Sequence, residues 1–186
     1  AVGRGQELWR GKGSVGAEWC GAGFGGEPRL QPACVGELCR LLQGEGIHTA
    51  LDTSGVWADW DGACQVLEHT DLILGDLKFA TPEEYQLHCK ADMEKPLAFY
   101  RLAEERGIPL WVRHVVVPGL NDSLEDMGKI QALAKSFSNL EKIEWLPFHN
   151  LRLEKYQSMG HPFPTQQPDT SGRHTLNTRD ATHLPA

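Results

Sequence analysis

Two hydrophobic periodicities alternate along the chain between Pro32 and His149. Stretches with apolar residues three or four positions apart predict helices, and short runs of β-branched or apolar residues predict strands. Pro32 stands at the start of the first helical stretch and Gly46 follows its end, as is typical of helix boundaries. The pattern predicts helices over 32–45, 58–69, 95–106 and 124–137, and strands over 47–52, 72–78, 110–118 and 142–148.

The alternation of helices and strands has the plan of repeated βα units. The strands start near positions 48, 72, 110 and 142, which is close to the roughly 30 residues that one (β/α) unit occupies. Right-handed crossover connections make such strands parallel. Four or five units are too few to close a standard barrel. The sequence therefore predicts an α/β fold that is either an open doubly wound sheet or a partial (β/α) barrel.

The two ends of the chain lack this regular pattern. Ten of the 20 glycines fall within the first 36 residues, and a short strand near 14–23 is the only element that this region suggests. The last residues are rich in Pro, Thr and Gln and nearly lack large apolar side chains. We predict an irregular segment over 1–24 and a disordered tail over 161–186.

Charge and hydropathy narrow the classes of function. The chain has 18 basic and 25 acidic residues and a net charge of -7, so it lacks the positive charge that carries most nucleic-acid affinity. No apolar run approaches the roughly 18 to 20 residues of a membrane span, and the start lacks the apolar stretch of a signal peptide. We expect a cytoplasmic monomer with neither nucleic acid nor membrane as a partner.

The cysteines and two of the tryptophans favour structural roles. The five cysteines have irregular spacing and no C-x-x-C pair, which gives no disulfide framework. Cys34 and Cys39 are five residues apart in a predicted helix and therefore lie on different faces, which argues against a shared metal. We expect all five cysteines to be buried thiols, and Trp111 and Trp145 to be core residues of their strands.

The predicted strands carry charged or hydrogen-bonding side chains at or near their ends, namely Asp52, Thr53, Asp76, Lys78, Arg113 and His149. The carboxyl ends of parallel strands meet at one edge of a sheet, so these side chains are expected to gather there. Asp76 and Lys78 are two residues apart and share a face of their strand. A mixed set of carboxylates and cations suits a zwitterionic ligand.

Each of these side chains also has an ordinary structural explanation when taken alone. Asp52 can cap a turn, Lys78 can extend to solvent, and Arg113 can pair with a helix carboxylate. Their coincidence at one edge favours a site. The segment Gly25-Gly26-Glu27 reaches the same edge if the short strand near 14–23 exists. Its glycines would let the backbone approach a ligand, and its carboxylate would accept from an ammonium group.

The phrases GIHTALDTSG, LILGDLKF, EERGIPLWVRHVVVPGLNDS and LEKIEWLPFHNL, with FGGEP ahead of them, closely resemble the pyruvate formate-lyase activating enzymes. These are radical S-adenosylmethionine enzymes that activate glycyl radical enzymes. The resemblance implies a partial (β/α) barrel over 25–160 that opens laterally to admit a segment of a pyruvate formate-lyase-like partner. It also implies reduced flavodoxin or ferredoxin as the electron donor, in anaerobic metabolism.

The resemblance implies the cofactors as well. The family cleaves S-adenosylmethionine reductively with a 4Fe-4S iron-sulfur cluster, and the radical takes a hydrogen atom from a glycine of the partner. That chemistry requires no acid–base side chain, so we name no catalytic residue. Matched residue by residue, the positions that would bind S-adenosylmethionine are Gly25, Gly26, Glu27, Asp76, Leu77, Lys78 and His149. Those that would hold a monovalent cation are Asp52, Thr53 and Asp76.

The sequence departs from the family in its cysteines. The family holds its cluster with a C-x-x-x-C-x-x-C run, and this sequence contains no such run. We expect an activating enzyme truncated at its cluster-binding N-terminus. The alternative is a non-catalytic fragment that binds S-adenosylmethionine or the partner. A lyase with Lys78 as Schiff-base nucleophile ranks last, because the neighbouring Asp76 favours the charged amine.

Overall fold

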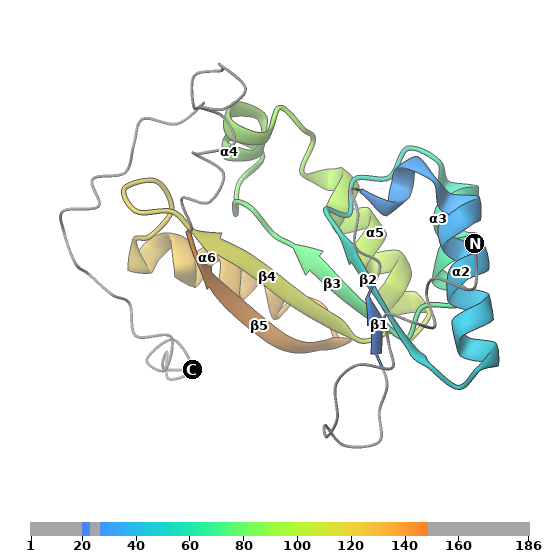
Figure 1. Cartoon of the computed structure of the whole chain (residues 1–186). Helices are drawn as coiled ribbons and strands as arrows, with labels where there is room; N and C mark the ends of the chain where they lie inside the picture. The colour runs from blue at the N-terminus through green and yellow to red at the C-terminus, as the bar shows by residue number, and fades with distance from the viewer. Residues whose placement is uncertain (1–19, 23–26, 149–186) are drawn as a thin grey trace, which may run out of the picture.

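The structure is a computed structural model, and it describes residues 20–22 and 27–148 of the 186-residue chain. Outside the described residues lie nearly all of the predicted irregular segment 1–24 and the whole predicted tail 161–186. The same holds for the site positions Gly25, Gly26 and His149. In chain order the elements are β1 (Cys20–Ala22), η1 (Pro28–Leu30), α2 (Pro32–Gly44), β2 (His48–Thr53), α3 (Trp60–Leu67), β3 (Leu72–Asp76), α4 (Pro82–Glu84), η2 (Tyr85–Cys89), α5 (Glu94–Glu105), β4 (Leu110–Val116), α6 (Leu124–Ala134) and β5 (Leu140–Pro147) (Figure 1).

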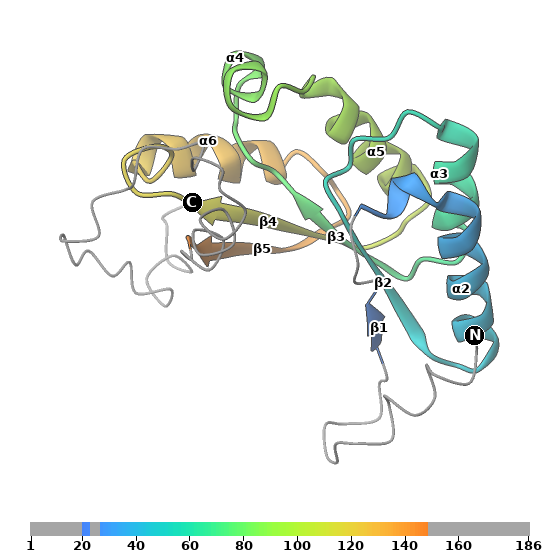
Figure 2. The same cartoon turned by 45° about the horizontal axis from the view of Figure 1, so that its top comes forward.

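The five strands form one parallel sheet in the order β1-β2-β3-β4-β5. Each strand thus lies beside the next strand in the chain, and the order has no reversal point of the kind that defines a doubly wound sheet. Helices α2, α3, α5 and α6 all lie on the same side of the sheet (Figure 2). The predicted α/β fold with parallel strands is confirmed, and of its two variants the structure has the partial-barrel arrangement.

Helices α3 and α6 each begin directly after a residue whose side chain caps them. The side chain of Asp59 accepts a hydrogen bond from the backbone of Gly62 at 3.0 Å, and Ser123 does the same for Asp126 at 3.1 Å. After α5 the chain turns at Gly107, which has a φ of 67°. Helix α6 ends three residues before the predicted end, because the chain turns there and brings Phe137 into the core, where it is 2% exposed.

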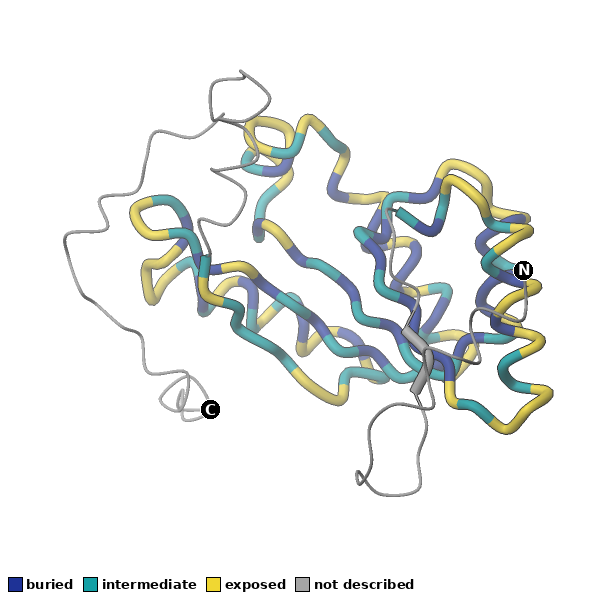
Figure 3. The backbone as a smooth tube through the Cα atoms, in the orientation of Figure 1, coloured by how far each residue is buried: buried dark blue, intermediate teal, exposed yellow. Residues whose placement is uncertain are grey.

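The core lies between the sheet and the helices that cover one of its faces (Figure 3). Burial alternates along β4, so that Leu110, Val112, His114 and Val116 face the helices. Trp111, Arg113 and Val115 therefore lie on the opposite face, which we term the open face.

The structure corrects two expectations about buried residues. Trp111 is not a core residue, because it lies on the open face with the ammonium of Lys142 4.7 Å from its ring centre. Trp145 is partly buried and packs edge to face against His114 at 5.5 Å between ring centres. The expectation of buried thiols holds for Cys39 and is wrong for Cys34, which is exposed on α2, while Cys64 and Cys89 are partly buried. The side chain of Cys20 lies outside the description.

Candidate functional site

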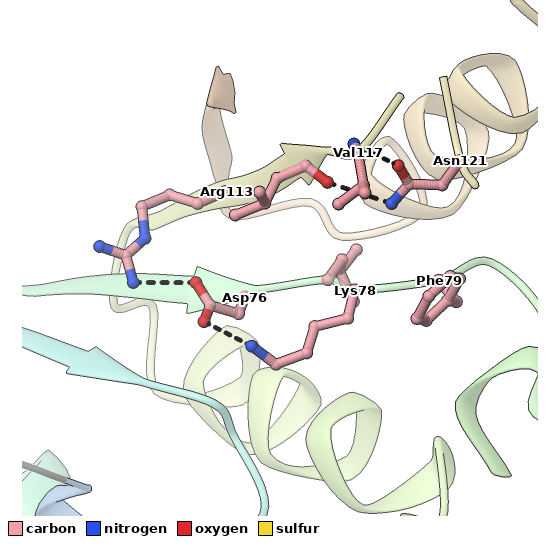
Figure 4. Close-up of a pocket in the computed structure, with 8 residues that line it drawn as sticks. Asp76, Lys78, Phe79, Arg113, Val117 and Asn121 are labelled. Carbon is pink, nitrogen blue, oxygen red and sulfur yellow. Dashed lines mark hydrogen bonds and ion pairs between the residues drawn. The ribbon is translucent and has the colours of Figure 1, made fainter. Parts of the chain in front are cut away.

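Arg113 joins two carboxylates from two other strands. Arg113 of β4 is in register with Asp76 of β3, and Asp52 comes from β2 on the far side of β3. Nη1 of Arg113 donates to Oδ2 of Asp52 at 2.8 Å, and Nη2 donates to Oδ1 of Asp76 at 2.8 Å. The side chains of Arg113 and Asp76 point toward each other in Figure 4. The alternative explanation of Arg113, a pair with a helix carboxylate, does not hold, since both partners belong to strands.

The network continues to Lys78. Its Nζ lies 3.1 Å from Oδ2 of Asp76, while the lysine side chain remains 46% exposed. Two carboxylates and two cations thus alternate along the C-terminal edge of the sheet. Burial lowers the pKa of Arg113, but the hydrogen bonds and charges of Asp52 and Asp76 outweigh burial and raise it. The guanidinium is a permanent positive charge at this edge.

Glu27 is fixed to the neighbouring end of β2. The hydroxyl of Thr53 donates to Oε1 of Glu27 at 2.7 Å, and the backbone N–H of Ser54 donates to Oε2 at 3.2 Å. Gly55 then turns the chain with a φ of 73°. These contacts hold the last residue of the Gly25-Gly26-Glu27 segment beside the strand ends that carry the ion network.

A pocket of about 150 Å³ opens beside the ion network. Asp76, Lys78 and Arg113 give its lining both signs of charge, and the other lining residues are mostly apolar (Figure 4). Asn121 orders the segment after β4, because it accepts from the backbone N–H of Val117 at 2.6 Å and donates to the carbonyl of Val115 at 3.0 Å. The lining residues are Asp76, Leu77, Lys78, Phe79, Arg113, Val115, Val117 and Asn121.

The structure brings most of the described site predictions together. Asp52, Asp76 and Lys78 share one network, and Thr53 and Glu27 form a pair at the next strand end. Leu77 lines the pocket but is completely buried, and its backbone N–H donates to the carbonyl of Arg113 at 3.0 Å. The sequence placed Arg113 at this edge without assigning it to the binding set. Its register with Asp76 on the adjacent strand is the signal that identifies it.

The residues predicted to hold the monovalent cation already have partners. The carboxylates of Asp52 and Asp76 accept from Arg113, and the hydroxyl of Thr53 is donated to Glu27. Within residues 27–148 there is no group of three or more His, Cys, Asp or Glu side chains that could hold a metal ion. A cation at this position would have to replace the guanidinium, and this site stays a prediction.

The described cysteines do not fit an iron–sulfur cluster. Cys34 and Cys39 lie on α2, Cys64 on α3 and Cys89 on η2, and no three of these thiols come together in the described part of the chain. A cluster of this kind needs several thiolates directed at one centre. The described residues therefore supply no cluster site.

Comparison with known proteins identifies the class to which this fold and site belong. The model of the radical SAM superfamily matches residues 21–130, and the chain belongs to that superfamily. Within it, the chain is similar to pyruvate formate-lyase activating enzymes. It is 36% identical over 136 residues to the enzyme of Clostridium pasteurianum, which covers 73% of this chain and 56% of that protein. It is 35% identical over 140 residues to the pyruvate formate-lyase 1-activating enzyme of Escherichia coli K12, which covers 75% and 57%.

A solved structure supports the fold. A domain of a pyruvate formate-lyase activating enzyme from Bacteroides vulgatus superposes with a TM-score of 0.61 and 23% identity, over 75% of this chain and 92% of that domain. The resemblance inferred from the sequence phrases is confirmed. The chain spans just over half the length of the curated relatives that it matches. None of the helices within the described ranges is long and apolar enough to cross a bilayer.

Proposed function

We propose that this chain binds S-adenosylmethionine at the C-terminal edge of its sheet and serves the activation of a glycyl radical enzyme of the pyruvate formate-lyase type. Membership in the radical SAM superfamily gives the class of chemistry. The observation that carries the proposal is the alternating network of Asp52, Arg113, Asp76 and Lys78 beside Glu27. It offers both charges that a zwitterionic amino acid requires.

Different residues of this edge would bind the carboxylate and the amino group of the methionyl part of the ligand. Lys78 is half-exposed, lines the pocket and directs its ammonium toward Asp76, from where it would receive the ligand carboxylate (Figure 4). Glu27 lies at the end of β2 and would accept from the ligand amino group, with Gly25 and Gly26 allowing close approach of the backbone. The proposed binding set is Gly25, Gly26, Glu27, Asp76, Leu77, Lys78 and His149.

S-adenosylmethionine supplies, on one-electron reduction, the radical that removes a hydrogen atom from the partner's glycine. The chain's own residues bind and orient it. The proposal includes a reduced flavodoxin or ferredoxin as donor, a monomeric cytoplasmic protein, and a monovalent cation near Asp52, Thr53 and Asp76. The cluster ligands are not among the described residues. That observation favours a second candidate function, a non-catalytic module that binds S-adenosylmethionine or the partner.

Titration calorimetry of the full chain with S-adenosylmethionine tests the proposal. Lys78→Met removes the proposed carboxylate contact. Lys142→Met is a matched control, because Lys142 is equally exposed at 46% and also pairs with a carboxylate two residues away in the chain, Glu144 at 2.9 Å. We expect Lys78→Met to weaken binding about tenfold or more and Lys142→Met to leave it unchanged. Absence of binding by the unaltered chain, or equal effects of the two variants, would contradict the proposal.

A second measurement separates the two candidate functions. The full chain is reconstituted anaerobically with iron and sulfide and incubated with S-adenosylmethionine and a strong reductant, and methionine and 5'-deoxyadenosine are quantified. Cleavage supports the activating enzyme. Binding without cleavage supports the non-catalytic module.

A further inference from the structure

Three buried side chains hold the backbone of the segment Asp76-Leu77-Lys78 from the helix side of the sheet. The hydroxyl of Tyr100 donates to the carbonyl of Asp76 at 3.0 Å. Nδ1 of His114 lies 2.7 Å from the carbonyl of Leu77. The hydroxyl of Tyr85 accepts from the backbone N–H of Lys78 at 3.0 Å. The segment where β3 leaves the sheet is therefore held at three consecutive residues.

These side chains come from three different elements and are shielded from water. Tyr85 belongs to η2, Tyr100 to α5 and His114 to β4, and all three are at most 2% exposed. Burial raises the pKa of Tyr85 to about 12 and that of Tyr100 well above its ordinary value, so both keep their hydroxyl protons at neutral pH. A carbonyl oxygen only accepts, so Nδ1 of His114 carries the proton that it donates to Leu77.

Two glycines make room for Tyr100. A Cβ atom at Gly75 would lie 2.6 Å from the ring of Tyr100, and one at Gly55 would lie 2.9 Å from it. Gly75 directly precedes the held segment, and Gly55 follows the end of β2. The strand ends are thus shaped to admit the tyrosine that binds the carbonyl of Asp76.

The consequence for the site is a fixed orientation of alternate side chains. With its backbone held, Leu77 points into the core and is fully buried, while Asp76 and Lys78 point to the open face and pair at 3.1 Å. Ligand-binding groups must stay within about 0.5 Å of their productive positions, and that precision comes from the residues that support them. A buried carbonyl or N–H without its partner would also cost free energy and favour a shifted backbone.

We propose that Tyr85, Tyr100 and His114 are positioning residues of the S-adenosylmethionine site, acting through the backbone of the segment Asp76-Leu77-Lys78. None of them contacts the ligand in this role. The inference rests on the proposed function for its ligand. Its geometric half, that these side chains fix the strand end, is independent of any ligand.

The variants remove one hydrogen bond each and keep the bulk of the side chain. Tyr85→Phe and Tyr100→Phe delete the hydroxyls, and His114→Leu deletes the donor. His114→Asn is the conservative variant, because its amide also donates from a position near that of Nδ1. Thr70→Val is the matched control, since the 6% exposed Thr70 donates its hydroxyl to the carbonyl of Val66 at 2.8 Å, away from the site.

Amide hydrogen exchange of the unliganded full chain tests the geometric half. We expect the Lys78 amide to exchange about tenfold faster in Tyr85→Phe than in the unaltered chain, as loss of one buried hydrogen bond predicts. The amide of Ile73, which donates to the carbonyl of Pro109 at 2.9 Å, should be unaffected in both Tyr85→Phe and Thr70→Val. An unchanged Lys78 amide in Tyr85→Phe overturns the inference.

Calorimetry with S-adenosylmethionine tests the link to the site. Tyr85→Phe, Tyr100→Phe and His114→Leu should weaken binding by about threefold to tenfold, with His114→Asn close to the unaltered chain and Thr70→Val without effect. The inference is overturned if Tyr85→Phe, Tyr100→Phe and His114→Leu weaken binding no more than Thr70→Val does. It is also overturned if His114→Leu and His114→Asn weaken binding equally. If the unaltered chain binds no S-adenosylmethionine, the proposed function fails, and the exchange of the Lys78 amide alone still decides whether the strand end is held as we infer.

Discussion

At the scale of single residues, Arg113 is the least exposed cation among the ion pairs of the described residues. It is 18% exposed and bridges Asp52 and Asp76, so its removal leaves two partly buried carboxylates facing each other. We expect Arg113→Gln to lower the free energy of unfolding by about 2 kcal/mol, less than for a fully buried pair because solvent reaches the site. Urea denaturation at neutral pH measures this loss.

The control for Arg113 is another arginine with a carboxylate partner. Arg40 pairs with Glu37 at 2.8 Å on α2, where both side chains are more than half exposed. Arg40→Gln should leave stability almost unchanged, because solvent screens such pairs. Equal losses of stability for Arg113→Gln and Arg40→Gln would contradict a larger contribution of the Arg113 network to the free energy of unfolding.

His114 makes stability depend on pH. Burial lowers its pKa, and so does Lys78, while the Leu77 carbonyl and the carboxylates of Asp126 and Asp76 raise it less. Its folded pKa therefore lies below that of the unfolded chain, and the unfolded state takes up the proton first as pH falls. The contribution of neutral His114 to the free energy of unfolding is complete above about pH 6.5 and declines below that pH.

The variant His114→Asn removes this titration and keeps a donor for Leu77. When the pH is lowered from 7.5 to 5.5, the midpoint of urea denaturation should fall further for the unaltered chain than for the variant. All other residues are the same in the two proteins, so the comparison isolates the contribution of His114. Identical pH slopes for the two proteins would contradict the assignment of a buried neutral imidazole.

The sequence predicts part of the site because it predicts where strands end. Asp52, Asp76 and Lys78 follow apolar runs and therefore meet at one edge, as the structure confirms. Tyr85, Tyr100 and His114 could not be found in this way. They reach the strand end through tertiary contacts between residues 7, 24 and 37 positions apart, and no local periodicity encodes such contacts.

At the scale of elements, Asp71 connects α2, β2 and the start of β3. Its carboxylate accepts from the backbone N–H of Thr49 at 2.8 Å, from the Thr49 hydroxyl at 3.0 Å and from Gln43 at 2.9 Å. Burial raises the pKa of Asp71, but these hydrogen bonds outweigh it and the pKa is lowered. The stability that this carboxylate contributes is present above about pH 4 and is lost as pH falls through the lowered pKa.

Replacement of the Asp71 carboxylate should therefore make the free energy of unfolding less dependent on pH in the acid range. We expect Asp71→Asn to cost about 1 kcal/mol at pH 7 and less as the pH approaches 3. Circular dichroism during urea titrations at several pH values measures the difference. Asp92→Asn is the control, since Asp92 accepts from one backbone N–H in an exposed turn. A loss for Asp71→Asn that does not shrink toward low pH would rule out this linkage.

The packing of α5 on β3 depends on the missing side chain at Gly75. Gly75→Ala would place a methyl group 2.6 Å from the ring of Tyr100, and we expect a loss of about 2 kcal/mol from overpacking. Gly128→Ala in α6 is the control, because nothing lies within 4 Å of its added Cβ, and it should stabilise by about 0.5–1 kcal/mol. A double-mutant cycle with Tyr100→Leu, read by urea denaturation, should show that the Gly75→Ala cost falls when the ring is absent. Additive losses would refute the contact.

At the scale of the whole molecule, the order of the strands could not be predicted from their spacing. The repeat length sets the size of each βα unit, and it leaves open which strand lies beside which. The sequential order β1-β2-β3-β4-β5 is what places all the covering helices on one side and leaves the open face, with Arg113 and Trp111, on the other. The class of fold was therefore predictable, whereas the choice between its two variants required the pairing of the strands.

The arrangement of thiols predicts how the whole chain behaves on reconstitution with iron and sulfide. The thiols of Cys34, Cys39, Cys64 and Cys89 lie on three separate elements and form no common group in the described part of the chain. The sequence contains no C-x-x-x-C-x-x-C run. We expect anaerobic reconstitution of the full chain to leave well below one 4Fe-4S cluster per molecule, because scattered thiolates cannot bind one cluster face. Iron and sulfide analysis with electron paramagnetic resonance of the reduced sample measures this. Cys34→Ser should give the same low iron content, whereas a full complement of four iron and four sulfide per chain would show that this chain carries its own cluster.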